Sequence, residues 1–352
     1  IGTGVVGKAD LMEEIARVYG YDRVPETRLA DDLPPQRGHR ELTLEERLRD
    51  LLVSLGLQEV INHRLTSPED EARRFPPEVK PEEPYNHLLN PISPERSALR
   101  RSLLASVLDT VERNYRIQDR ITIFEIGPVF LPDTEKELPL EAKRLAIAIT
   151  GPRHLPDWGH EQTTAMDFYD LKGILETTFE GLHLRDVRFE RGQHPSFHPG
   201  KCAYVYLGEE RIGSFGELHP MVKEQYDLPE TPLMAGEFDL STLLAAVPTL
   251  FDVTPIPDQP PVLEDIALIL DEDIPAAEVE FLIRQTGGET LTNIRLFDTY
   301  RGDQIGEGKK SLAYSLTYQS AERTLTDKEV AKLRNRIVRR LEKELGANLR
   351  DK

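Results

Sequence analysis

The stretch DIALILDEDIPAAEVEFLIRQTGGETLTNIRLFDTYRGDQIGEGKKSLAYSLTY, residues 265–318, decides the fold of the last part of this chain. Alternating or continuous apolar residues predict strands in it, and helical spacing of apolar residues predicts helices. Together with the residues that follow, it predicts strand 265–271, helix 275–286, strands 291–300 and 310–318, helix 326–345 and strand 347–350. The order β-α-β-β-α-β is the split βαβ plan of ferredoxin-like domains.

Upstream of this stretch lies a proline-dense segment, TPIPDQPPVLED, residues 254–265. Prolines at this density interrupt regular hydrogen bonding, so we expect a domain boundary there. Before it, residue spacing predicts helices at 10–19, 42–55 and 168–180, a helix in the second half of 90–115, and strands at 57–65, 121–131, 144–151, 202–208 and 210–218. The expected class is α+β, with an antiparallel sheet module followed by a ferredoxin-like (βαββαβ) domain.

The composition is that of an acidic, proline-rich protein long enough for two or three domains, with 352 residues, 26 prolines and a formal net charge of −18. The negative balance argues against a general phosphate-coating nucleic-acid binder, so any RNA contact requires a local basic patch. Because no run of about 18 apolar residues occurs, we expect no membrane span. We interpret the chain, which begins at Ile1 without a signal peptide, as part of a longer polypeptide. Its single cysteine, Cys202, favours the reducing cytoplasm.

Three carboxylates cluster near the start, in DLMEEIARVYGYDRVP, residues 10–25. Asp10, Glu13 and Glu14 share one face of a helix, where their oxygens suit a hard cation such as Mg²⁺. The same D-x-x-E spacing is also a helix-capping pattern, and acids in a first turn complement the helix dipole. Spacing alone favours the cap, although a capping residue is not thereby excluded from binding an ion.

Basic residues gather in the last domain. On helix 326–345 an apolar stripe is formed by Val330, Leu333, Ile337, Leu341 and Leu345. Much of the remaining surface is basic, through Lys332, Arg336, Arg339, Arg340 and Lys343. The loop between two predicted strands adds Tyr300, Arg301, Lys309 and Lys310. Basic groups beside an aromatic ring on a four-stranded sheet suit a single-stranded RNA loop, but an ordinary solvated helix face explains the helix equally well.

Motifs of common active sites are missing from the sequence. It contains no P-loop, no G-x-G-x-x-G and no G-x-S-x-G. His194 and His198 lie in HPSFHPG, where prolines and a glycine favour structural histidines in a loop or strand entry over metal ligands, and His219 is similar. Cys202 follows Gly200-Lys201 and is expected to be a buried small hydrophobe.

Taken together, several long motifs resemble the β subunit of bacterial phenylalanyl-tRNA synthetases. ADLMEEIARVYGYDRVP resembles the end of the family's B5 domain. NPISPERSALRRSLLASVL, IFEIGPVF, FHPGKCA and IGSFGELHP resemble its catalytic-like module. DIALILDE, LFDTYRG, GEGKKSLAYSLTYQSAERTLTD and LEKELGANLR resemble its ferredoxin-fold anticodon-binding domain. The resemblance covers essentially the whole chain, in the expected order.

The resemblance implies three domains: the end of B5 at 1–30, an inactive class II synthetase-like module at 31–250, and an anticodon-binding domain at 256–350. A class II catalytic sheet needs an arginine two positions before the motif-2 glutamate to hold the ATP α-phosphate. Here Glu125 is preceded at that offset by Ile123. We therefore expect no adenylation site on this chain and expect ATP to be bound by the partner α subunit of an α2β2 assembly.

The resemblance also assigns site residues. Asp10, Glu13 and Glu14 match acids that share a Mg²⁺ with the α subunit, although a further Asp of that pattern is replaced by Gly4. The family usually has an arginine before DIAL, where this chain has Glu264, so we expect tRNA contacts elsewhere. The predicted tRNA-binding residues are Tyr300, Arg301, Lys309, Lys310, Arg336 and Arg340. Editing of misacylated tRNA belongs to domains upstream in the family, so we expect none here.

The expected function is that of a phenylalanine-tRNA ligase β-subunit portion that supports the α-subunit active site and binds the tRNA(Phe) anticodon stem-loop. We expect it in the cytoplasm, with no membrane or DNA partner. One alternative is a stand-alone RNA-binding or regulatory protein derived from a synthetase domain. Another, an independent aminoacyl-adenylate enzyme, is disfavoured by Ile123.

Overall fold

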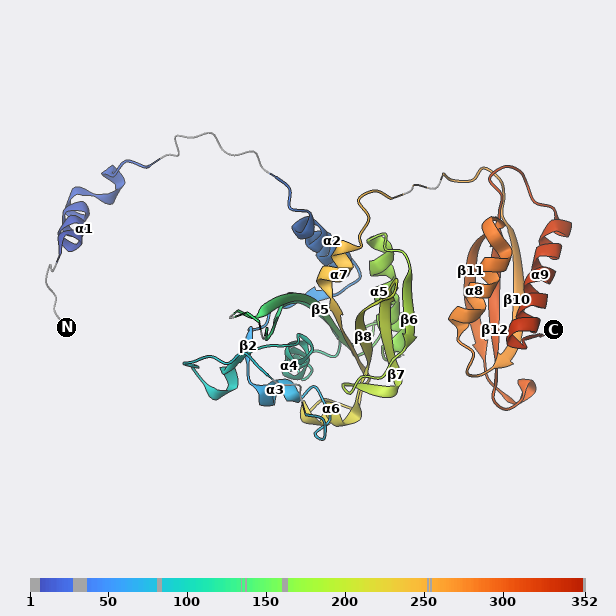
Figure 1. Ribbon diagram of the computed structural model, residues 1–352, viewed down its shortest axis with the longest axis horizontal. Coiled ribbons are helices and arrows are strands. Elements are labelled where there is room, and N and C mark those ends of the chain that lie inside the picture. The colour runs from blue at the N-terminus through green and yellow to red at the C-terminus, as the bar shows by residue number, and fades with distance from the viewer. Residues whose placement is uncertain are drawn as a thin grey trace. The chain divides into compact units, whose positions relative to one another are not determined.

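The computed structural model describes residues 7–27, 37–80, 84–133, 135–136, 138–159, 164–251, 253 and 255–350 (Figure 1). The chain divides into two compact units, residues 1–251 and 252–352, and each is described by itself. In the part of the chain that the structure describes, helices are too short or too polar to cross a membrane.

Helix α1 (Lys8–Tyr19) begins two residues before its predicted start and ends at the predicted residue. Gly20 ends it, with a φ of 103° and a backbone N–H that donates to Ala16 O at 2.9 Å. That φ favours glycine, which has no Cβ to clash with the backbone. The apolar side chains of α1 are exposed in this structure, including Leu11, Ile15 and Val18.

A mixed but mostly antiparallel sheet forms the centre of the first unit. In the described residues it has seven strands in the order β1-β4-β5-β9-β8-β7-β6, in which only the β1–β4 pair is parallel. The strands are β1 (Gln58–Glu59), β4 (Ile121–Leu131), β5 (Leu140–Thr150), β6 (Val187–Arg191), β7 (Phe197–Leu207), β8 (Glu210–Leu218) and β9 (Leu233–Asp239). The antiparallel pattern predicted for this region is confirmed.

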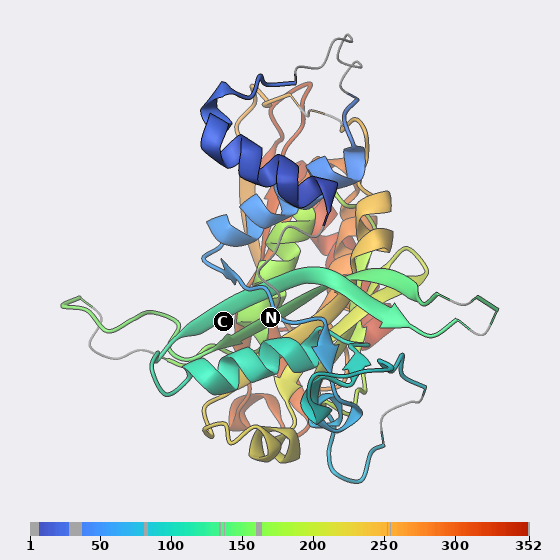
Figure 2. The same cartoon turned by 90° about the vertical axis from the view of Figure 1, so that its left-hand side faces the viewer.

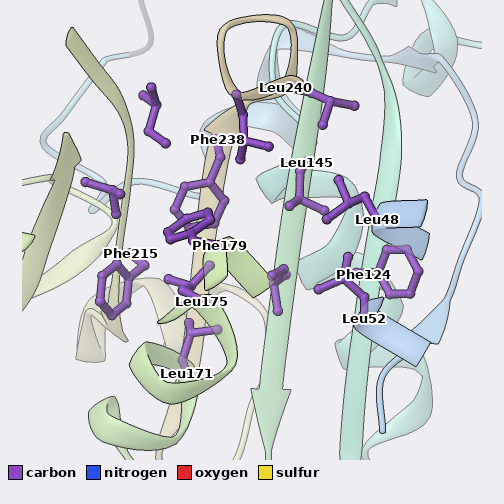
Figure 3. Close-up of a cluster of buried hydrophobic side chains, with 14 of the residues drawn as sticks. Leu48, Leu52, Phe124, Leu145, Leu171, Leu175, Phe179, Phe215, Phe238 and Leu240 are labelled. Atoms are coloured by element: carbon purple, nitrogen blue, oxygen red, sulfur yellow. The ribbon is translucent and has the colours of Figure 1, made fainter. Parts of the chain in front are cut away.

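Helices cover both faces of this sheet, because its central strands carry apolar side chains on both sides. Strand β5 shows the division, since Leu145 and Ile147 join one cluster while Ala146 and Ala148 join the other. The first cluster includes side chains of α2 (Arg40–Ser54), α5 (Phe168–Gly181) and α7 (Leu240–Ala245). Figure 3 shows its large side chains, with Leu48 and Leu52 of α2 beside Phe124 and Leu145.

The second cluster lies on the opposite face, over the short side chains of Ala146 and Ala148. Helix α4 (Leu104–Asn114) supplies most of its helical part, and α6 (Pro220–Gln225) adds Val222. Three further short elements lie before α4: helix α3 (Pro68–Ala72) and the antiparallel pair of strands β2 (Leu65–Thr66) and β3 (Ala98–Leu99). Figure 2 shows α4 running alongside the long β4–β5 strands.

The strand predicted over 57–65 is wrong in extent. Only β1 and the start of β2 form there, and the residues between them leave the ladder. Val60 N–H still donates to Phe124 O at 2.8 Å, but Asn62 turns both its backbone N–H and its side-chain amide to the carboxylate of Glu125, at 3.3 and 2.8 Å. A buried carboxylate therefore takes the donors that a longer strand would have used.

The second unit has the predicted β-α-β-β-α-β order. Its elements are β10 (Val262–Asp271), α8 (Ala276–Gly287), β11 (Leu291–Tyr300), β12 (Lys309–Tyr318), α9 (Asp327–Leu345) and β13 (Asn348–Leu349). Its strands, as far as the structure describes them, pair antiparallel in the order β11-β12-β10-β13. The α+β class and the ferredoxin-like plan are confirmed.

Both helices of this unit pack on one face of its sheet. Leu312, Tyr314 and Leu316 of β12 point to that side and are buried with residues of α8 and α9. The predicted stripe on α9 is confirmed, because Val330, Ile337 and Leu341 are buried and Leu333 and Leu345 pack against them. Strand alternation places the side chains of Ser311, Ala313 and Ser315 on the other face.

Candidate functional site

The acidic residues of α1 take up capping and ion-pairing contacts. Asp10 Oδ2 accepts a hydrogen bond from the backbone N–H of Gly7 at 2.9 Å. Because the helix begins at Lys8, Asp10 is the third helical residue and bonds back to the Gly7 cap, so the capping pattern starts three residues before the predicted one. Glu14 pairs with Arg17 at 2.6 Å, and Glu13 is exposed.

By donor type, these three carboxylates suit Mg²⁺, which prefers oxygen ligands. Among the described residues, however, no three or more histidine, cysteine or acidic side chains are grouped so as to hold a metal ion. Gly4, which departs from the expected acidic pattern, lies outside the described residues. The metal assignment of Asp10, Glu13 and Glu14 therefore stays a prediction.

The predicted RNA loop brings three of its basic residues to one corner, where β10 ends and β12 begins. Lys309 pairs with Asp271 at 2.6 Å, and Arg301 holds Glu272 through Nε and Nη2 at 3.0 and 2.8 Å. Lys310 is only 8% exposed, and its Nζ donates to the backbone carbonyl of Glu272 at 2.7 Å. The hydrogen bond from Arg301 holds the pKa of Glu272 below its usual range.

The two helix arginines lie elsewhere in the domain. Arg336 donates to the backbone carbonyl of Thr286, near the end of α8. Arg340 donates to Thr286 Oγ1 at 3.1 Å and to Glu344 at 2.8 Å. Both side chains thus bind α9 to α8 in the helical layer, whereas Tyr300 pairs with Ser311 across β11 and β12. The six predicted residues therefore form two groups rather than one patch.

Sequence reasoning missed one neighbour of Tyr300. The guanidinium carbon of Arg350 lies 5.0 Å from the centroid of the Tyr300 ring. These residues come from β11 and from the end of the chain beyond β13. Only the strand order brings them together, so no local motif could have indicated the pair.

Glu125, the residue compared with the catalytic glutamate of class II enzymes, is engaged by a buried arginine. Arg100 Nη1 lies 2.6 Å from Glu125 Oε1, with the two side chains 3% and 2% exposed. Arg100 Nε also donates to Pro128 O at 3.0 Å. Ile123, at the position of the expected arginine, is buried in the cluster beneath α4. The ion pair between Glu125 and Arg100 therefore holds the segment that precedes α4 against strand β4.

The histidines and the cysteine singled out in the sequence also make contacts within the first unit. Burial, with Arg74 and Arg211 nearby, lowers the pKa of His194 to about 4, and its Nδ1 accepts from Ser196 N–H at 3.3 Å. His198 and His219 accept backbone N–H groups in the same way. Cys202 is buried, which raises its pKa to about 11. The expected burial of Cys202 is confirmed, and the interpretation of the three histidines as structural stays a prediction that their backbone contacts support.

Comparison with known families agrees with these two units. A family model described as phenylalanyl tRNA synthetase beta chain CLM domain matches residues 24–240, and one described as ferredoxin-fold anticodon binding domain matches residues 257–350. This chain belongs to the phenylalanyl-tRNA synthetase beta chain family. The family predicted from sequence motifs is therefore confirmed.

Curated members of this family match almost the whole chain. It is 40% identical over 349 residues to the phenylalanine–tRNA ligase beta subunit of Symbiobacterium thermophilum, covering 98% of this chain and 39% of that protein. The corresponding proteins of Geobacillus kaustophilus and Clostridium acetobutylicum are 40% and 35% identical, each covering 97% of this chain and 42% of the relative. The chain thus spans about two fifths of the length of these relatives.

A solved pyrrolysyl tRNA synthetase structure from Desulfitobacterium hafniense is similar with a TM-score of 0.45 and 19% identity. The aligned region covers 58% of this chain and 65% of the pyrrolysyl tRNA synthetase chain.

Proposed function

We propose that this chain is the C-terminal portion of a phenylalanine–tRNA ligase β subunit, with the end of B5 at 1–30, an inactive class II module at 31–250 and an RNA-binding domain at 256–350. The observation that carries the proposal is the pair of consecutive family matches, over 24–240 and 257–350. In this role the chain supports the α-subunit active site and binds the anticodon stem-loop of tRNA(Phe) during ATP-dependent aminoacylation in the cytoplasm.

Catalysis and ATP binding belong, in this proposal, to the α subunit of an α2β2 assembly. Two properties of the first unit support an inactive module. Its Glu125 carboxylate is neutralised by Arg100 rather than exposed to a nucleotide, and Ile123 occupies the position where an arginine would bind the ATP α-phosphate. The module therefore acts as a scaffold for the partner subunit.

Co-expression tests this assembly. The full-length β chain that contains these residues should co-purify with a candidate α subunit and elute from a sizing column at the mass of two α and two β chains. A β chain that binds tRNA but never retains the α subunit would instead identify a stand-alone RNA-binding protein derived from a synthetase domain.

The acids of α1 would supply Mg²⁺ ligands at the junction with the α subunit. Asp10, Glu13 and Glu14 provide the hard oxygen donors that this ion takes, and a bound ion would neutralise charge between the subunits. The test is Mn²⁺ substitution in crystals of the αβ complex. We expect an anomalous peak beside these carboxylates, and its absence would leave Asp10 with capping alone.

For tRNA, we propose that the corner formed by Arg301, Lys309 and Lys310 contacts backbone phosphates. Each cation already has a partner in the chain, so a phosphate would have to compete with Asp271, Glu272 or a carbonyl group. The K309A/K310A variant should bind a tRNA(Phe) transcript more weakly and with a shallower salt dependence, by up to about one unit of slope per lost phosphate contact.

Two further variants make this test sharper. K309A alone removes the more exposed cation and leaves the buried Lys310 contact intact, so it separates charge loss from local unfolding. K343A removes an exposed lysine of α9 and should leave both affinity and slope unchanged. Unchanged binding by K309A and by the double variant would exclude this corner.

A further inference from the structure

The end of the first unit leaves the core and then contacts the surface of the same unit again. Val247, which follows α7, is 4% exposed, and its backbone carbonyl accepts a hydrogen bond from Arg40 Nη2. Three residues later Leu250 is 88% exposed, so the chain has left the core there. Phe251, the final residue of the unit, then stacks on the imidazole ring of His183, with ring centroids 3.9 Å apart and 20° between the planes.

His183 lies at a helix end that ordinarily favours glycine. Its φ of 57° is in the left-handed region. Its N–H donates to Glu180 O at 2.8 Å, and the N–H of Leu184 donates to Phe179 O at 2.9 Å, which is the Schellman pattern that ends a helix. Glycine is the usual residue at this position because it has no Cβ. A histidine there supplies a ring, and that ring contacts Phe251.

The start of the second unit is held to its own unit by hydrogen bonds. Gln259 is half-buried and precedes β10, which begins at Val262. Its backbone carbonyl accepts from Gln319 Nε2 at 2.6 Å, and its side-chain Oε1 accepts from Thr324 Oγ1 at 2.7 Å. Both donors belong to the segment between β12 and α9. Gln259 is therefore attached through its main chain and through its side chain.

Between these two attachments the sequence has seven residues, 252–258. We infer that the His183–Phe251 stack and the Gln259 contacts are two clamps that fix the length of the tether between the units. The eight steps from Phe251 to Gln259 span at most about 26–29 Å. Without the clamps, the fifteen steps from Val247 to Val262 would span up to about 50–54 Å. This inference goes beyond the proposed function, because it is independent of what the second unit binds.

Distances between two spin labels in the whole chain test the first clamp. One nitroxide is attached at T177C on α5 and the other at K328C on α9, both exposed positions, while the buried Cys202 is expected to stay unlabelled. Double electron–electron resonance measures the distribution of label separations. H183G removes the ring and suits the left-handed backbone, so the helix end should stay intact while the chain is freed back to Val247. The upper limit of the distribution should then rise by up to about 14 Å, for four more residues.

Two further variants separate the ring stack from the helix end. F251A, at a side chain that is 52% exposed, removes the other ring without changing the helix end, and should widen the distribution as H183G does. H183F keeps a ring at residue 183 and is the matched control, so it should give the distribution of the unaltered chain. Unchanged upper limits in H183G and F251A would overturn the first clamp. Widening in H183F equal to that in H183G would overturn it as well, because residue 183 would then act without its ring.

The second clamp is tested with the same labels. Q319A/T324A removes both donors to Gln259 and frees the chain up to Val262. The upper limit should rise by up to about 11 Å, for three more residues, and by the sum of both increases when H183G is added. A distribution in Q319A/T324A identical to that of the unaltered chain would show that these hydrogen bonds do not set the tether length.

Discussion

Replacing Arg100 with methionine should show how the first unit depends on its buried ion pair. The substitution keeps most of the apolar stem but removes the guanidinium that lies 2.6 Å from Glu125. The Glu125 carboxylate would stay buried and, among the residues that the structure describes, would keep the side-chain and backbone N–H groups of Asn62 as donors, at 2.8 and 3.3 Å. The backbone carbonyl of Pro128 would also lose its donor.

The expected cost follows from this geometry. Removing one partner of a buried pair typically costs about 3–5 kcal/mol, because the remaining charge is left uncompensated. Because Asn62 still donates to the carboxylate, we expect the R100M substitution to lower the free energy of unfolding by about 3 kcal/mol, the lower end of this range. That corresponds to a change on the order of a hundredfold in an unfolding equilibrium. Converting Glu125 to glutamine in the R100M background removes the stranded charge, so the double variant should be more stable than R100M.

Hydrogen exchange of peptides covering β4 is the appropriate assay, because it reports on the first unit even though the chain has two. The matched control is R144M. Arg144 pairs with Asp239 at 2.7 Å, but both side chains are 26% exposed, so its loss should cost about 1 kcal/mol or less. If R100M accelerates exchange no more than R144M does, burial does not determine the strength of these pairs, and our account of Glu125 is wrong.

Four other substitutions test the fold. Burial raises the pKa of Glu71 from 4.5 to about 7, so the folded state binds the proton of this carboxyl group more tightly than the unfolded state does. The protonated group therefore contributes its full share to the stability of the fold below pH 4.5, and this contribution is lost as the pH rises to about 7. E71Q should therefore be more stable than the unaltered chain at pH 8, by up to about 3 kcal/mol, and show no such advantage at pH 4, as measured by urea unfolding. G151A should lower the free energy of unfolding by more than about 2 kcal/mol and so lower the urea midpoint. Gly151 has a φ of 99°, and a Cβ added there would lie 2.1 Å from Asp119 O. L48A, at a fully buried position, should cost about 2–5 kcal/mol in the same assay, whereas L89A, at a side chain that is 98% exposed, should change stability by less than about 0.5 kcal/mol.

Regular elements were predictable wherever local spacing decides them. Helices α2, α5 and α9 lie within two residues of their predicted bounds, and β11 matches its predicted range. Periodicity alone reveals such elements, because an apolar stripe has to meet a core. The strand predicted over 57–65 was wrong for a reason that no local pattern contains. The competing partner of Asn62 is the carboxylate of Glu125, which lies on another strand.

The candidate RNA site shows the same limit. Sequence reasoning selected basic residues near Tyr300 by type and proximity, and three of them do gather at one corner of the sheet. It could not show that these cations already have partners, nor that Arg336 and Arg340 bind α8. Partner choice depends on distance in space and on burial, neither of which residue type specifies.

By itself, the sequence determined the family, the α+β class, the order of elements and the side of α9 that is buried. These follow from patterns repeated every two to four residues and from motifs that stay intact along the chain. The tertiary structure alone decided which groups the charged side chains meet, as with Arg100 on Glu125 and Arg350 over the Tyr300 ring. The physical reason is that electrostatic and stacking energies act over a few ångströms of space, and strand pairing places within that range residues that are far apart in sequence.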